Sequence, residues 1–199
     1  FTLLGLYYLN SANPSEQIRN KITALADHLV SLQKDHMSNE WKWFEPYLTY
    51  SNSKLSESLF YAYLATGNET YLQAAKSSLD FLISITFEKN RFVPIGQKGW
   101  YIKKGHRAYF DQQPVDSASM VQTLHIAYTI TKDDRYRTLA IIAFQWFLGR
   151  NSLNQALYVH SSGGCHDGIG QFSINFNQGT ESTISYMIAR LTLDTGVMP

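Results

Sequence analysis

Apolar residues recur at three- and four-residue spacing in two segments of the chain that resemble each other, YAYLATGNETYLQAAKSSLDFL and IAYTITKDDRYRTLAIIAFQWFL. The segments align at a constant offset of 65 residues, from Tyr71 to Tyr136 and from Leu79 to Phe144. This spacing is typical of helices. The polar turns inside the segments, 66–68 and 131–133, supply a stop and a cap. Each segment therefore predicts two antiparallel helices joined by a short turn.

A weaker copy of the same pattern precedes them. Residues 1–33 predict a helix, a turn at 10–14 and a second helix, with Pro14 suited to its first turn. A last helix is expected from about Glu181 to Leu193, before the closing DTGVMP. The pattern thus predicts an all-α chain of seven helices, three pairs and a half. We expect residues 1–199 to form a single helical-hairpin domain. Since stacked pairs need neighbours and the chain starts at Phe1 without Met, we expect it to be part of a larger barrel.

The connections between helices alternate in length. Turns within a pair are short, whereas the linkers between pairs cover roughly 35–54, 88–113 and 151–179. Linkers of that length are usually functional. Because the pairs are antiparallel, all three long loops are expected on one face. RFVPIG and GWYIKK in the second linker could pair as a hairpin.

Each long linker leads into a helix that carries an acid in its first turns, namely Glu57, Asp116 and Glu181. Such acids also complement the helix dipole and need no chemistry for that. Two carboxylates about 5–10 Å apart across a cleft would support glycosidic cleavage, since one donates a proton and the other activates water or attacks. We take Asp116 and Glu181 as the preferred pair, with Asp111 and Glu57 in reserve.

Aromatic, amide and charged side chains surround these acids, and 14% of the chain is aromatic. Rings stack on the C–H faces of sugars, and amides pair with hydroxyls. The alternative is that the Trp rings only cover the ends of the core. The candidate sugar-binding residues are Trp41, Trp43, Glu45, Tyr50 and Asn52 in the first linker, Trp100, His106, Arg107, Gln112 and Gln113 in the second, and His166, Asp167, Asn177 and Gln178 in the third.

Charge and composition exclude several classes of function. The net charge is +1, without a basic field for nucleic acid, and no apolar run is long enough to span a membrane. The single Cys165 fits a reducing compartment, so we expect a cytoplasmic location. Cys165, His166 and Asp167 are adjacent, and adjacent residues rarely share a metal. No phosphate-binding glycine motif is present, so neither a metal nor an organic cofactor is expected.

Three loop motifs carry a resemblance to a known family. They are WxWFEPYLTYSNSKLSESL, then PIGQKGWY…RAxFDQQPVDSASM, then GGCHDGI…NxNQGTESTISY. With these motifs the chain resembles bacterial (α/α) toroid domains related to six-hairpin glycosidases, a kind also found beside glycosyltransferase modules. The resemblance implies a complete or partial (α/α) toroid, a carbohydrate-related role and Glu181 as an acid of the cleft. A full six-pair toroid needs more than the seven helices predicted here.

The chain is therefore expected to be a glycoside hydrolase-like domain that cleaves or remodels a glycan by acid/base chemistry in a loop-lined aromatic cleft. The expected ligand is an oligosaccharide or polysaccharide. A non-catalytic glycan-binding or scaffold module, covalently linked to a glycosyltransferase, is one alternative. A protein-binding helical repeat is another, and it would carry its binding residues on a concave helical surface rather than in the loops.

Overall fold

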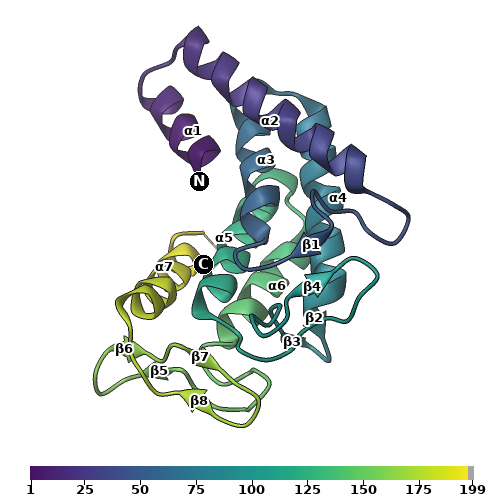
Figure 1. The fold of residues 1–199 in the computed structure, drawn as a ribbon. Helices are drawn as coiled ribbons and strands as arrows, with labels where there is room; N and C mark the ends of the chain where they lie inside the picture. Colours follow the sequence, from purple (N-terminus) through teal and green to yellow (C-terminus); the bar gives the residue numbers. More distant parts are fainter. Residues whose placement is uncertain (197–199) are drawn as a thin grey trace. The chain divides into compact units, whose positions relative to one another are not determined.

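Seven helices follow one another along residues 1–196, the part of the chain that the computed structural model describes (Figure 1). The helices are α1 (Thr2–Ala12), α2 (Glu16–His36), α3 (Ser53–Thr66), α4 (Glu69–Thr86), α5 (Pro114–Thr131), α6 (Asp134–Gln145) and α7 (Thr180–Gly196). Strands are confined to two-residue pieces within the connectors. The predicted all-α class and the seven helices are confirmed for the described residues.

The short strands pair only in antiparallel twos. The pairs are β1 (Tyr47–Leu48) with β4 (Tyr101–Ile102), β2 (Phe87–Glu88) with β3 (Arg91–Phe92), β5 (Tyr158–Val159) with β6 (Gly164–Cys165), and β7 (Gly168–Ile169) with β8 (Ile174–Asn175). The expected hairpin between RFVPIG and GWYIKK is therefore wrong. Its two halves pair with other segments: β3 pairs with β2, directly after α4, and β4 pairs with β1.

The chain divides into two compact units. The first unit consists of Phe1–Pro46 and Ser53–Leu82, and the second consists of Tyr47–Asn52 and the chain from Ile83 onward. The six residues Tyr47–Asn52 separate the two parts of the first unit along the sequence. This piece of the first long linker belongs to the second unit.

In the first unit, α1, α2 and α3 pack against one another around Ile22, Ala26 and Leu59. The hydroxyl of Tyr71 donates to Asp27 at 2.7 Å, which ties α4 to α2. Pro14 lies just before α2 rather than in its first turn, since Ser15 is the N-cap residue.

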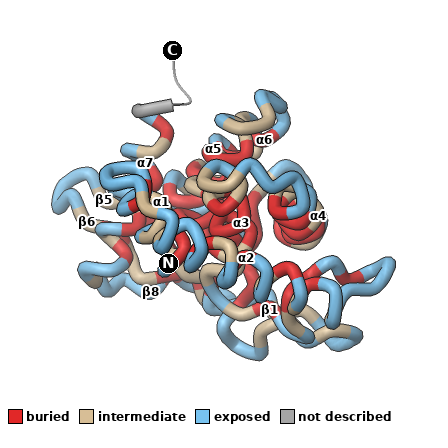
Figure 2. Tube along the Cα trace, turned by 90° about the horizontal axis from the view of Figure 1, so that it is seen from above, coloured by how far each residue is buried: buried red, intermediate tan, exposed pale blue. Residues whose placement is uncertain are grey.

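In the second unit, α5 lies against both α6 and α7. Every residue from Asp116 to Met120 on α5 is buried, and Figure 2 shows the helix coloured as buried over much of its length. The hydroxyl of Ser117 donates to the carbonyl of Ala143 at 2.7 Å, which ties α5 to α6. On the other side Tyr186 of α7 stacks on Tyr158 at 4.0 Å between ring centroids. The buried helix thus gives the connectors a fixed base.

The 65-residue repeat holds at the level of single hydrogen bonds. Asn68 accepts from the backbone N–H of Thr70 at 2.9 Å, and Asp133 accepts from Arg135 N–H at 2.9 Å. Gly67 and Lys132 both have positive φ, 71° and 58°, where the first helix of each pair stops. Tyr71 and Tyr136 are each 1% exposed. The predicted turns and their caps are confirmed.

Two helix ends differ from the expectation. The second repeat segment predicts a helix up to Leu148, but α6 ends at Gln145. Two features after this point stop the helix: Gly149 adopts φ 101°, and the side chain of Asn151 donates to the carbonyl of Trp146 at 2.8 Å. The last helix continues past Leu193 to Gly196. The rest of the expected terminal turn, 197–199, lies outside the described residues.

Removing either cap should destabilise the unit that contains it. Asn68→Ala and Asp133→Ala each remove an acceptor for a helix N-terminus, so each should lower the free energy of unfolding by about 1 kcal/mol. Urea denaturation followed by circular dichroism measures the loss. The matched controls Asn68→Asp and Asp133→Asn keep a capping oxygen and should stay near wild type; equal losses in the controls and the alanine variants would contradict the assignment.

Candidate functional site

Pieces of all three long connectors meet within the second unit. β1 from the first connector pairs with β4 from the second. Gln112 from the second connector forms an antiparallel bridge with Ile169 from the third, with N–O distances of 2.9 and 3.0 Å. Segments that are far apart in sequence are therefore paired within this unit. The second connector is thus paired with both the first and the third. The expectation that all three long loops lie on one face stays a prediction.

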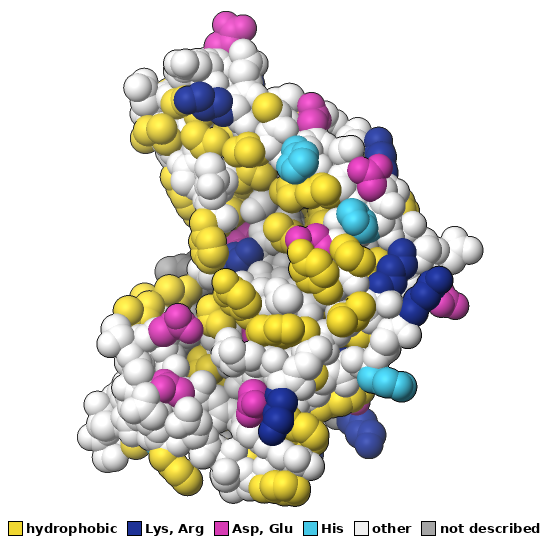
Figure 3. Space-filling model, in the orientation of Figure 1, with side chains coloured by type: hydrophobic (Ala, Val, Ile, Leu, Met, Phe, Trp, Pro, Cys, Tyr) yellow, Lys and Arg dark blue, Asp and Glu magenta, His cyan; other side chains and the backbone are white. Residues whose placement is uncertain are grey.

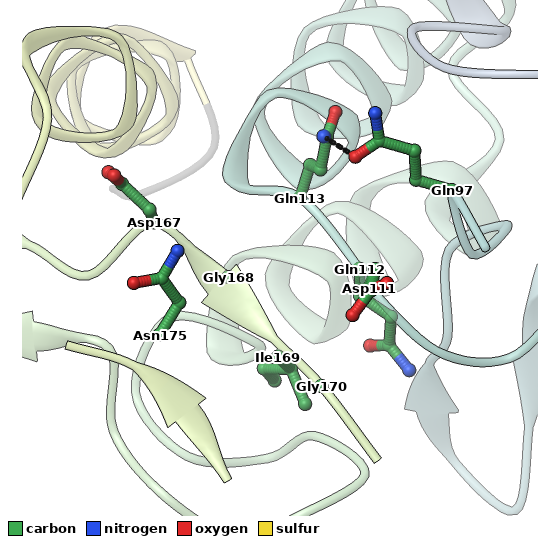
Figure 4. Close-up of a pocket in the computed structure, with 9 residues that line it drawn as sticks. All are labelled: Gln97, Asp111, Gln112, Gln113, Asp167, Gly168, Ile169, Gly170 and Asn175. Carbon is green, nitrogen blue, oxygen red and sulfur yellow. Dashed lines mark hydrogen bonds between the residues drawn. The ribbon is translucent and has the colours of Figure 1, made fainter. Parts of the chain in front are cut away.

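A cavity of about 170 Å³ lies at the junction of the second and third connectors. Amides, two carboxylates and a glycine-rich strand line it, from Gln97, Asp111, Gln112, Gln113, Asp167, Gly168, Ile169, Gly170 and Asn175. Figure 4 shows Gln97 and Gln113 on one side, joined by a hydrogen bond of 2.6 Å, and Asp167 and Asn175 on the other. The cavity thus presents mainly hydrogen-bonding groups.

Gln112 lines this cavity, and hydrogen bonds hold its side chain in place. Its side chain is buried, and it donates to the carbonyl of Tyr109 at 2.9 Å and to the hydroxyl of Ser152 at 2.8 Å. Its amide oxygen accepts from the indole N–H of Trp146 at 2.9 Å. A buried amide that is satisfied on both ends holds its backbone in place. Gln112, predicted to bind sugar, therefore acts first as a structural link between connectors.

Asp167 caps α7 from outside the helix. One carboxylate oxygen accepts from Gly179 N–H at 2.7 Å and from the hydroxyl of Ser182 at 2.6 Å, and the other accepts from the amide of Asn177. These donors, the Ser182 hydroxyl first, lower the pKa of Asp167. Asp167 is thus an ionised group that orients the start of α7 and lines the cavity at the same time.

Asp116 sits in the first turn of α5 and is 7% exposed. Burial raises the pKa of this carboxyl to about 7, and the hydrogen bond from Ser51 N–H at 2.6 Å opposes that rise. Its second oxygen has no hydrogen-bond partner among the described residues. A carboxyl that holds its proton near neutral pH is suited to general acid chemistry. Asp116 does not line the cavity, but Gln113 does, three residues earlier.

The other predicted acids lie in different surroundings. Asp111 lines the cavity and is exposed. Glu181 is exposed in the first turn of α7, next to Ser182, and does not line the cavity. Glu57 belongs to the first unit, where it is buried and forms an ion pair with Lys54 at 2.5 Å.

An aromatic pair lies beside these groups. The ring centroids of Tyr50 and Trp100 are 6.2 Å apart, and Tyr50 is 60% exposed. Trp100 closes a turn with Gly96 and has φ 56°, and the same turn carries Gln97 of the cavity wall. Gly96 is required there, because an added Cβ would collide with the backbone of Phe110. Tyr50 and Trp100 therefore form a ring pair with one exposed member, and their role in stacking on a sugar stays a prediction.

Several predicted sugar-binding residues have contacts that stabilise the fold. Trp41 and Trp43 are 3% and 0% exposed and pack on Phe81 in the first unit. The carbonyl of Glu45 accepts from the Trp41 indole at 2.8 Å. Arg107 donates to the carbonyls of Ile85 and Val93, so its guanidinium is held by the second connector itself. For the two Trp residues, the alternative of a core role fits their burial.

The remaining predicted residues are distributed around the loops. Asn52 closes a turn with Thr49 through bonds of 2.9 and 2.7 Å. His106 is exposed. The ring of His166 lies 3.0 Å from the carbonyl of Phe176, and Gln178 accepts from Ser162 at 2.7 Å. None of them lines the cavity.

Sequence reasoning did not single out Gln97 or the strand of Gly168, Ile169 and Gly170 as parts of the site. The glycines at 168 and 170 were the available signal in the sequence, because a glycine in a strand can mark a close backbone approach. The structure shows that approach: a Cβ on Gly168 would collide with the carbonyl of Gln112.

Charge gives no further clue to a ligand. Figure 3 shows acidic and basic side chains scattered over the viewed face, without a continuous basic surface. Among the described residues no group of three or more His, Cys, Asp and Glu side chains could hold a metal ion. In the same part of the chain, no helix is both long and apolar enough to cross a membrane.

The comparisons with known proteins give the family. The model of Glycosyl Hydrolase Family 88 matches residues 15–166, three quarters of the chain. The chain belongs to this family, which is of the six-hairpin glycosidase type with an (α/α) toroid fold. The search among curated proteins found no match. The match ends at His166. The cavity residues of the third connector, from Asp167 to Asn175, and helix α7 lie beyond it.

Membership confirms the resemblance and the all-α toroid class that the sequence predicted, and it supports a glycoside hydrolase-like function. A bacterial source and a linked glycosyltransferase module are not part of what the match shows.

Replacing Gln112 with Leu should destabilise the second unit strongly. The change keeps the size but leaves the Trp146 indole and the carbonyl of Tyr109 without their partner, so we expect a loss of about 2–4 kcal/mol in the free energy of unfolding. Urea denaturation measures it. Gln113→Leu is the matched control, since Gln113 is half-buried and binds only Gln97, and it should lose less than about 1 kcal/mol. Similar losses in both variants would contradict the role of Gln112.

The raised pKa of Asp116 makes stability depend on pH. Between its unfolded value of 3.8 and its folded value of about 7, the folded chain binds a proton that the unfolded chain has lost. The free energy of unfolding of the wild type should therefore fall relative to Asp116→Asn as pH rises from 4 to 7, and level off above. Urea denaturation at a series of pH values measures the difference; a constant difference would contradict the assignment.

Proposed function

We propose that this chain is a carbohydrate-active domain that seats a glycan in the cavity between its second and third connectors and cleaves or remodels it by acid/base chemistry. The observation that carries the proposal is the lining of that cavity, where amides of Gln97, Gln113 and Asn175 surround two carboxylates. Sugar hydroxyls both donate and accept hydrogen bonds, and amides and carboxylates offer the matching groups. The exposed ring of Tyr50, beside Trp100, supplies a face for stacking.

In this proposal Asp116 is the proton donor. Its burial keeps a proton on the carboxyl up to about pH 7, and its second oxygen is unpartnered. Glu181 remains the proposed carboxylate partner, in line with the motif in which it stands. Asp111 is the alternative partner, because it lines the cavity whereas Glu181 does not. Glu57 is left out of the pair, since Lys54 occupies its carboxylate.

A second candidate function is glycan binding without catalysis, as a module that serves another catalytic domain. One observation favours it: Asp116 is 7% exposed and does not line the cavity. In that case the cavity and the aromatic pair would hold the glycan, and the carboxylates would act only as hydrogen-bond acceptors.

Amide variants separate the two functions. If Asp116 donates the proton, Asp116→Asn should lower hydrolysis of a bound oligosaccharide at least about 100-fold while leaving its binding nearly unchanged. Wild-type hydrolysis should also decline above about pH 7, as the Asp116 carboxyl loses its proton. Glu181→Gln and Asp111→Asn identify the partner by the same loss. Initial rates and isothermal titration on the same samples provide both readouts.

Asp134→Asn is the matched control, because Asp134 is an exposed acid in the first turn of α6 and should keep full activity. Binding without hydrolysis in the wild type would favour the module. Hydrolysis that survives in all three amide variants would contradict the acid/base proposal.

A further inference from the structure

A second cavity, of about 210 Å³, lies within the second unit and shares no lining residue with the first cavity. The β2–β3 hairpin forms one wall, and the second and third connectors complete the lining. The lining residues are Glu88, Lys89, Arg91, Val93, Tyr109 and Ser152. Although charges are scattered over the surface as a whole, two cationic side chains thus meet in one small hollow.

The hairpin fixes where the two cationic residues stand. Lys89 and Asn90 connect its strands with positive φ of 49° and 60°, as in the tight type I′ turns of hairpins. The register places Glu88 opposite Arg91. The guanidinium of Arg91 donates from Nη1 to the carbonyl of Asn151 at 3.2 Å. This one bond anchors the guanidinium, and its other N–H groups have no partner among the described residues, so they can bind a ligand.

The one acid of the lining is already paired. Glu88 accepts from Arg107 at 3.3 Å, and the guanidinium of Arg107 also lies 4.5 Å from the ring centroid of Tyr109. The side chain of Arg107 is only 9% exposed, so it is fixed behind these two lining residues. Lys89 forms no ion pair with a described residue. Because Arg107 offsets the charge of Glu88, the charges of Lys89 and Arg91 remain for a ligand.

Ser152 adds a hydroxyl group that its neighbours hold in place. Its Oγ accepts from the amide of Gln112 at 2.8 Å, which leaves the hydroxyl hydrogen for another acceptor. The preceding residue, Asn151, is buried, and its side chain donates to the carbonyls of Trp146 and Gln155 at 2.8 and 2.7 Å. The backbone at Ser152 is therefore anchored, and the cavity offers a donor on the side away from the hairpin.

We propose that this second cavity is a binding site for a phosphate group, either inorganic phosphate or a phosphomonoester. Arg binds phosphate oxygens as a fork of parallel hydrogen bonds, and Lys supplies a point charge. A phosphate group carries about −1.5 to −2 charges at neutral pH, which matches the two cations, whereas a carboxylate carries one. The site is separate from the cavity that we propose to hold a glycan, so the inference goes beyond that function and does not depend on it.

The test is a titration of the intact ¹⁵N-labelled chain with inorganic phosphate at constant pH and ionic strength, followed by the backbone amide signals in two-dimensional NMR. Signals of residues 88–93, 109 and 152 should shift and saturate together. Acetate should bind at least about ten-fold more weakly, since it brings less charge and fewer oxygens. Shifts that do not saturate, that lie elsewhere in the chain, or that are equal for acetate would overturn the proposal.

A parallel titration with glycerol 3-phosphate distinguishes the two sources of the phosphate group. Tighter binding than inorganic phosphate, with the same signals shifted, assigns the site to a phosphomonoester. Equal or weaker binding at the same signals assigns it to the free anion. Glycerol 3-phosphate and phosphate that shift different sets of signals would overturn the proposal, because a single phosphate site must respond to both.

Charge variants locate the binding groups. Arg91→Gln should weaken phosphate binding at least about ten-fold, because it removes the fork and one charge. Lys89→Gln should weaken it at least about three-fold, and it reports on binding even if Arg91→Gln does not fold, since Lys89 is exposed. Lys98→Gln is the matched control, because Lys98 is exposed and does not line the cavity, so it should change the affinity less than about two-fold. An unchanged affinity in Lys89→Gln, or an equal loss in Lys98→Gln, would overturn the proposal.

Discussion

The buried amide of Gln112 is the interaction on which the arrangement of the second unit depends. Its side chain joins Trp146, Ser152 and Tyr109, while its backbone pairs with Ile169. Gln112 and Ile169, more than fifty residues apart in the sequence, are thereby held in register, and the space left between their connectors is the cavity. Because α5 begins directly after Gln113, the same anchor fixes where Asp116 enters the helix. Loss of this one amide would leave several buried polar groups without partners at once.

The two acids of this region show how burial and hydrogen bonding divide carboxyl groups between roles. Asp167 has three donors and a lowered pKa, so it serves as a fixed anion at the start of α7. Asp116 has a single donor and a raised pKa, so it can carry a proton near neutrality. Their environments push the two pKa values in opposite directions, which is a common property of acid/base sites. Membership of Glycosyl Hydrolase Family 88 supports a glycoside hydrolase-like function, and Asp116 is the proton donor that we propose for it.

The helices and their turns could be predicted from the sequence because they obey local rules. The equivalence of Tyr71 with Tyr136 and of the caps Asn68 and Asp133 follows from spacing and side-chain chemistry alone. The pairing of short strands could not be predicted, since β1 finds its partner across more than fifty residues. Nor does composition separate an exposed ring from a core ring: Trp43 is fully buried, whereas Tyr50 is exposed. The amide of Gln112 predicts a sugar ligand, but the sequence does not show that its oxygen accepts a hydrogen bond from the indole of Trp146, 34 positions later.

We propose that the connectors of the second unit enclose a binding site for a sugar. A crystal structure of the chain with an oligosaccharide that binds in solution tests this. We expect a sugar ring in the cavity, with hydroxyls bonded to Gln97, Gln113 or Asn175 and a neighbouring ring near Tyr50. An oligosaccharide found elsewhere on the chain, with the cavity holding only solvent, would contradict it.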